Sequence, residues 1–98
     1  MLVRYPIHEE QLKALTGEPV YAVMHDGSFC CGTIDDVKDG QLRMTGFRGR
    51  ERLSLEPGTA QAQVSEFGLE QVLFRGGMWL ELKSLAFLFN LPSMLFMI

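Results

Sequence analysis

Two Asp-Gly pairs divide the first half of this chain into short extended segments, and they restrict its fold more than any other feature. Asp26-Gly27 follows a segment, Val20–Met24, in which every second residue is apolar. Such alternation predicts a half-buried strand, and Asp-Gly favours the tight turn of a β-hairpin. Asp39-Gly40 marks a second tight turn. We therefore predict three consecutive antiparallel strands, over 20–25, 28–37 and 41–45.

The segments on either side predict a helix and two further strands. Pro6 suits the first turn of a helix and Gly17 is typical of its end, so a short helix is expected between them. Periodicity returns at 69–74 and 78–82. Between these two segments, Arg75-Gly76-Gly77 is predicted to be a turn.

A glycine inside the second predicted strand, Gly32, indicates a bulge, a sharp bend or a close approach of another backbone segment. Five bent antiparallel strands in one small domain favour a barrel, because closure removes exposed sheet edges. The predicted fold is therefore mainly β, with an N-terminal helix followed by a five-stranded bent antiparallel barrel over 1–84. The glycine- and proline-punctuated stretch 46–68 is expected to be a long loop or an extended hairpin, and 85–98 an apolar C-terminal extension.

The order and spacing of these residues resemble the Sm-like (LSm/Hfq-type) family of SH3-like barrels. Its first signature is a helix, an apolar strand ending in Asp-Gly, and a strand with a glycine five residues later. The second is an apolar pair, Arg-Gly and another apolar strand, which the segment VLFRGGMWLEL at 72–82 resembles. The residues that match the first signature are Val20, Ala22, Met24, Asp26, Gly27, Gly32, Ile34 and Val37.

The resemblance implies a homo-oligomeric ring in which the fourth strand of one subunit pairs with the fifth strand of the next. It also implies a pocket for RNA bases, built from a stacking residue, an Asp-x-x-x-Asn run and the arginine of Arg-Gly. Arg75 supplies that arginine, whereas Cys30 occupies the stacking position and has no aromatic face. The Asp-x-x-x-Asn run is missing, since Gln41 or Leu42 stands at the Asn position. Any RNA pocket of this kind would therefore be an altered one.

A locally basic run lies inside an acidic chain. The net charge of −3 argues against a general basic coat for nucleic acid. Between 43 and 52, however, four arginines face a single acid, Glu51. Two interpretations stay open, a loop that contacts the phosphates of single-stranded RNA and a hairpin whose charges are solvated. The candidate nucleic-acid-binding residues are Arg75, Arg48, Arg50, Arg52 and Cys30.

The C-terminal end, LAFLFNLPSMLFMI from Leu85 to Ile98, carries no charged side chain. Such a run would promote aggregation in water, so it is expected to pack on its own barrel, on a neighbouring subunit, or on a membrane or partner protein. It is too short, and too broken by Pro92, for a simple membrane-spanning helix. The predicted oligomer interface consists of apolar residues near this end, namely Val72, Phe74, Trp79, Leu80, Phe87, Phe89, Leu95 and Phe96.

The sequence offers little for catalysis or metal binding. The neighbours Cys30 and Cys31 would point to opposite faces of a strand and are too close for a mutual disulfide, so reduced cysteines and a cytoplasmic location are expected. The acidic residues at 35–39 are expected to face solvent rather than a metal. The two histidines lie in different elements, without the pattern of a catalytic triad. No cofactor, metal or enzymatic activity is predicted.

Two functional classes fit these features. The leading one is a non-enzymatic, Sm-like oligomeric module, associated with RNA or another nucleic acid through an altered base pocket. The alternative is an assembly or scaffold protein that oligomerises through its barrel and uses its apolar tail to bind a partner protein or a membrane surface. The fold alone does not decide between them, because one fold hosts many functions.

Overall fold

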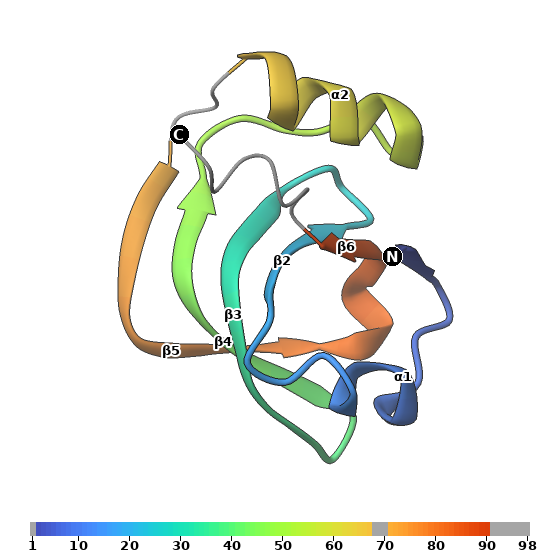
Figure 1. Cartoon of the computed structure of the whole chain (residues 1–98), viewed down its shortest axis with the longest axis vertical. Helices are drawn as coiled ribbons and strands as arrows, with labels where there is room; N and C mark the ends of the chain where they lie inside the picture. Colours follow the sequence, from blue (N-terminus) through green and yellow to red (C-terminus); the bar gives the residue numbers. More distant parts are fainter. Residues whose placement is uncertain (1, 68–70, 91–98) are drawn as a thin grey trace.

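A six-stranded antiparallel sheet with two short helices forms the described part of the molecule, so the prediction of a mainly β fold is confirmed (Figure 1). The computed structural model describes residues 2–67 and 71–90. The strands are β1 (Leu2–Arg4), β2 (Pro19–Met24), β3 (Phe29–Lys38), β4 (Gln41–Gly49), β5 (Gln71–Glu81) and β6 (Leu85–Asn90). The helices are α1 (Glu9–Lys13), α2 (Pro57–Phe67) and the 3₁₀ turn η1 (Leu82–Ser84).

The strands lie in the order β1-β6-β2-β3-β4-β5, and every neighbouring pair is antiparallel. In Figure 1, β3, β4 and β5 curve together around one side of the molecule, with α1 near one end and α2 near the other. The two predicted Asp-Gly turns join β2 to β3 and β3 to β4. At the first of them Gly27 has a φ of +89°, a conformation that glycine adopts without strain.

Buried side chains form two cores, one on each face of the sheet. The inner core includes Leu12 of α1 and apolar residues of β1, β2, β3, β4 and β6. Among the described side chains of β5, Met78 and Leu80 pack against it and are only partly buried. The outer core lies on the other face, where Ala60 and Val64 of α2 cover the sheet. The aromatic residues of this outer core are Tyr21, Phe29, Phe87 and Phe89.

The segment predicted as a long loop or extended hairpin, 46–68, has a different structure. Strand β4 continues to Gly49, and the 11-residue helix α2 follows after a short connection. Only Ala60 and Val64 of α2 are buried among its described side chains, and they lie four residues apart on one face. Such a narrow apolar face gives a weak helical signal in the sequence.

The expected apolar extension begins with a strand of the sheet. Leu85–Asn90 forms β6 and lies between β1 and β2, so the sheet does not end at residue 84. Phe87 and Phe89, which we expected at an oligomer interface, are 2% and 1% exposed in the outer core. They are buried within this chain because they pack among the outer-core residues, which include Ala60 and Val64 of α2. Leu95 and Phe96 lie outside the described residues.

The prediction of a turn at Arg75-Gly76-Gly77 is wrong. Strand β5 runs without interruption through these residues, and the chain reverses at η1 instead. A register shift opposite Met44 and Gly46, together with a φ of +82° at Gly77, allows β5 to bend without ending. The last strand is therefore 85–90 rather than 78–82.

Candidate functional site

Arg52, one of the candidate nucleic-acid-binding residues, forms an ion pair and a hydrogen bond with another residue of this chain. Its guanidinium forms an ion pair with the Asp26 carboxylate at 3.2 Å and donates a 2.7 Å hydrogen bond to the Asp26 carbonyl. The next backbone N–H, of Leu53, donates to the carbonyl of Gly27 at 2.8 Å. Arg52 thus fastens the segment after β4 to the β2–β3 turn.

The other candidate arginines are not gathered into one site. Arg48 lies on β4 with Cys30 as its Cα partner, and Arg50 follows the end of that strand. Both side chains are exposed, and neither takes part in an ion pair within the described part of the chain. Arg75 belongs to β5, but its side chain lies outside the described residues, as do those of Val72 and Phe74.

Cys30 cannot serve as a stacking position. Its side chain is 1% exposed in the inner core, where Sγ lies 3.8 Å from Sδ of Met78. Burial raises the pKa of this thiol to about 11, which keeps it protonated. Cys31 lies in the outer core, so the prediction that the two thiols occupy opposite faces of a strand is confirmed.

Trp79 stands out on the uncovered part of the outer face. Its side chain is 42% exposed, and Nζ of Lys38 lies 5.6 Å from the ring centroid, in the geometry of a cation–π contact. Arg43 is the Cα partner of Trp79 and is also exposed. The three side chains come from β3, β4 and β5, so only strand pairing brings this aromatic group and two cations together.

Strand β5 is also one edge of the sheet. Among the described residues it pairs with β4 alone, so the backbone groups on its other side have no strand partner. Next to Trp79, the residues Met78 and Leu80 are only partly buried against the inner core. The second half of β5 is therefore apolar on both faces and lies at an open edge.

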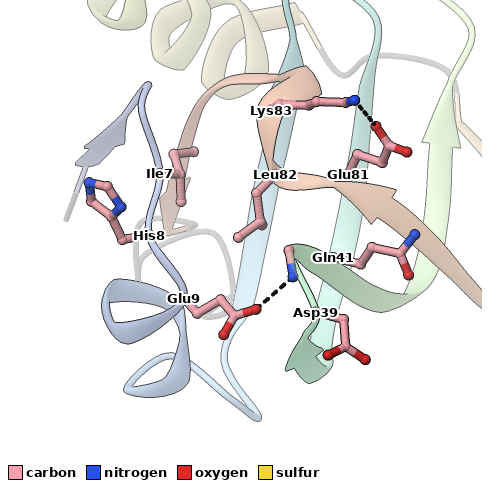
Figure 2. Close-up of a pocket in the computed structure, with 9 residues that line it drawn as sticks. Ile7, His8, Glu9, Asp39, Gln41, Glu81, Leu82 and Lys83 are labelled. Carbon is pink, nitrogen blue, oxygen red and sulfur yellow. Dashed lines mark hydrogen bonds and ion pairs between the residues drawn. The ribbon is translucent and has the colours of Figure 1, made fainter.

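An open pocket of about 550 Å³ lies where α1, the β3–β4 turn and the end of β5 meet (Figure 2). Oε1 of Glu9 accepts a 2.6 Å hydrogen bond from the backbone N–H of Gly40, and Glu81 forms a 3.3 Å ion pair with Lys83. With Asp39, the lining holds three carboxylates against one lysine. Such a charge balance disfavours the binding of phosphate. The residues that line this pocket are Ile7, His8, Glu9, Asp39, Gly40, Gln41, Glu81, Leu82 and Lys83.

No family model, curated protein or solved structure matches the chain. Functional inference therefore rests on its own residues and their geometry.

Two further observations restrict the chemistry of the described part of the chain. Within residues 2–67 and 71–90, no group of three or more His, Cys, Asp or Glu side chains could hold a metal ion. In the same residues, no helix has the length and apolar character needed to cross a bilayer. The surface features that offer binding chemistry are thus the β5 edge and the outer-face group of Lys38, Arg43 and Trp79.

Proposed function

We propose that this chain is a non-enzymatic, Sm-like assembly module that oligomerises through the edges of its sheet. The proposal draws on the sequence resemblance and on the strand order. When β1 is set aside, five antiparallel strands remain in the order β6-β2-β3-β4-β5, preceded by the helix α1. This arrangement is compatible with a bent, five-stranded SH3-like barrel behind an N-terminal helix.

The observation that carries the proposal is the second half of β5. An edge strand is a template for pairing with another chain unless charges, prolines or a covering element protect it. Residues 78–80 at this edge read Met-Trp-Leu, with no charge and no proline. Trp79 is exposed on one face while Met78 and Leu80 are partly exposed on the other, so an added strand would bury apolar area on both faces.

Oligomerisation can be tested by sedimentation velocity across a range of protein concentrations. We expect the wild-type chain to form oligomers as its concentration rises, and Trp79→Lys to raise the concentration needed at least tenfold. Leu55→Lys is the matched control, because Leu55 is 54% exposed but lies in the connection before α2. A wild-type chain that stays monomeric at all concentrations, or equal loss in both variants, would overturn the proposal.

A second function, binding of single-stranded nucleic acid, is favoured by the group of Lys38, Arg43 and Trp79. Exposed aromatic rings stack on bases, and neighbouring cations contact phosphates. The side chain of Trp79 is exposed, with Arg43 as its Cα partner on β4 and Nζ of Lys38, on β3, 5.6 Å from the ring centroid. The candidate site therefore moves from the expected pocket, where Cys30 is buried, to the outer face of the sheet.

The single tryptophan of this chain makes the second function directly measurable. A short single-stranded RNA should quench the fluorescence of Trp79, with an affinity that falls as salt is added. Arg43→Gln should weaken binding several-fold, whereas Lys13→Gln, on α1, should not. Unchanged fluorescence at low salt would exclude nucleic-acid binding at Trp79 and leave the assembly proposal unaffected.

A further inference from the structure

The other edge of the sheet is occupied by a very short strand. β1 has three residues, and its strand partner in the described part of the chain is β6. Once β1 is set aside, β5 and β6 are the fourth and fifth strands, which the resemblance implies would pair between copies. We propose that β1 is a displaceable cover of the β6 edge, which must leave before β5 of a second copy can pair there. This inference rests on the proposed function, because it names the step that controls assembly.

The contacts that hold β1 are few. Val3 is 6% exposed and pairs with Leu88, while Leu2 is only partly buried and Arg4 is exposed. One further backbone hydrogen bond, 2.9 Å from the N–H of Tyr5 to the carbonyl of Ala86, continues the pairing. A strand with a single well-buried side chain can separate at low cost compared with unfolding the domain.

The chain after β1 provides a fixed point for such a separation. Tyr5 is 55% exposed and touches His25 edge-on, with 5.0 Å between the ring centroids. Ile7, two residues later, is buried in the inner core. Residues 2–6 can therefore leave the sheet, with loss of the Tyr5–His25 contact, while Ile7 and α1 stay in place.

The strand beneath this cover is suited to a longer partner. β6 has six residues, of which Leu85, Phe87, Leu88 and Phe89 are buried, but β1 pairs with only three of the six. β5, at the opposite end of the same sheet, has 11 residues and an unpaired outer side within the described chain. A second copy can thus offer a longer hydrogen-bonded ladder than β1 does.

The apolar character of the two edges also favours a second copy as the partner. Both edges belong to this chain, and β5 offers apolar side chains on both of its faces, as β6 requires. β1 has the advantage of being tethered at high effective concentration, whereas a second copy must be recruited from solution. Assembly should therefore depend steeply on protein concentration. Because the two edges differ, the contact is head-to-tail and gives a closed ring or an open filament.

The test weakens β1 in the full chain. Val3→Ser removes its buried anchor, and Arg4→Ser changes its exposed neighbour as the matched control. In sedimentation velocity, Val3→Ser should lower the concentration for half-assembly at least tenfold, and Arg4→Ser should leave it unchanged. Adding Trp79→Lys to Val3→Ser should return the chain to the monomer, because it alters the incoming β5 edge.

Each outcome separates this inference from the proposed function. Equal assembly of wild type, Val3→Ser and Arg4→Ser would overturn the role of β1 and leave edge assembly standing, whereas assembly of none of them would overturn both. Assembly of Val3→Ser that persists with Trp79→Lys would overturn β5 as the partner. Should Val3→Ser fail to fold, a synthetic peptide of residues 1–6 replaces it. In excess over the wild-type chain this peptide should suppress assembly, a scrambled peptide should not, and equal effects of the two would overturn the inference.

Discussion

Gly32 of β3 and Gly46 of β4 are Cα partners whose backbones leave no room for a side chain between them. A Cβ atom added to Gly32 would lie 2.9 Å from Cα of Gly46, and one added to Gly46 would lie 2.6 Å from Cα of Gly32. Real Cβ atoms essentially never approach other atoms so closely. The register between β4 and β5 shifts directly after this crossing, between Met44 and Gly46. The paired glycines thus allow the sheet to bend at this position.

Replacing either glycine should destabilise the sheet by forcing the strands apart. We expect Gly32→Ala and Gly46→Ala each to lower the free energy of unfolding by about 2–3 kcal/mol, the upper part of the usual range of about 1–3 kcal/mol for an overpacked site, because the added methyl groups meet backbone atoms. Urea titration followed by circular dichroism measures the change. Gly58→Ala in α2 is the matched control, expected to stay within ~1 kcal/mol because alanine favours a helix. Equal midpoints for Gly32→Ala and Gly58→Ala would contradict this account of the bend.

The features predicted correctly are those whose signal is local. The Asp-Gly pairs define tight turns because only a few residues decide a hairpin. The interior Gly32 likewise indicated a close backbone approach, which the structure shows against Gly46. Alternation along β3 placed Cys30 and Cys31 on opposite faces, as found. Each of these conclusions depends on residues adjacent in sequence.

The errors arose where a distant segment decides the structure. Arg75-Gly76-Gly77 has the composition of a turn, yet a bulge opposite β4 keeps β5 continuous. The sequence places the residues of β6 in an apolar extension beyond the barrel, because nothing nearby in the sequence pairs with them. In the structure they pair with β2 and with the three-residue β1, which are distant in the sequence. Likewise, the group of Lys38, Arg43 and Trp79 spans three strands. Alternation along each strand can predict that a side chain is exposed, but it does not predict which side chains of different strands lie together.

A substitution at Phe89 tests whether this residue belongs to the core or, as expected from the sequence, to an oligomer interface. Its side chain is 1% exposed and stacks on Tyr21 with 5.4 Å between the ring centroids. Phe89→Ala should therefore lower the free energy of unfolding by about 3–5 kcal/mol in urea titrations. Trp79→Ala, with a side chain that is 42% exposed, should cost much less. A Phe89→Ala chain that kept its stability but lost only its oligomers would instead support the interface interpretation.

Because of Asp26, the stability of the β2–β3 turn should depend on pH in the acidic range. Its carboxylate accepts hydrogen bonds from Oγ and the backbone N–H of Ser28 and pairs with Arg52, which lowers its pKa from 3.8 to about 2. Because the folded pKa lies below the unfolded one, the stabilisation is present above pH 3.8 and is lost as the pH falls towards 2. Tm should therefore fall more steeply over this interval in wild type than in Asp26→Asn.

Ser28→Ala is the control for that comparison. It removes the largest cause of the lowered pKa, the side-chain hydrogen bond, while it keeps the carboxylate. Its Tm should show a pH dependence between those of wild type and Asp26→Asn. The difference between the variants isolates Asp26 from the other carboxylates, whose titration is common to all three chains. Parallel Tm curves for wild type and Asp26→Asn would show that the turn does not depend on this charge.

The two thiols should be unreactive in the folded protein at pH 8. Burial raises the pKa of Cys30 to about 11 and also raises the pKa of Cys31, so the reactive thiolate is scarce and shielded at both positions. A thiol-reactive dye should label neither cysteine over minutes at this pH, and should label both at once in guanidinium chloride. Because the folded pKa of Cys30 lies above its unfolded value of 9.0, folding stability should also decline between pH 9 and 11. Rapid labelling of one cysteine in the native state would place it at the surface and reopen Cys30 as a contact for RNA.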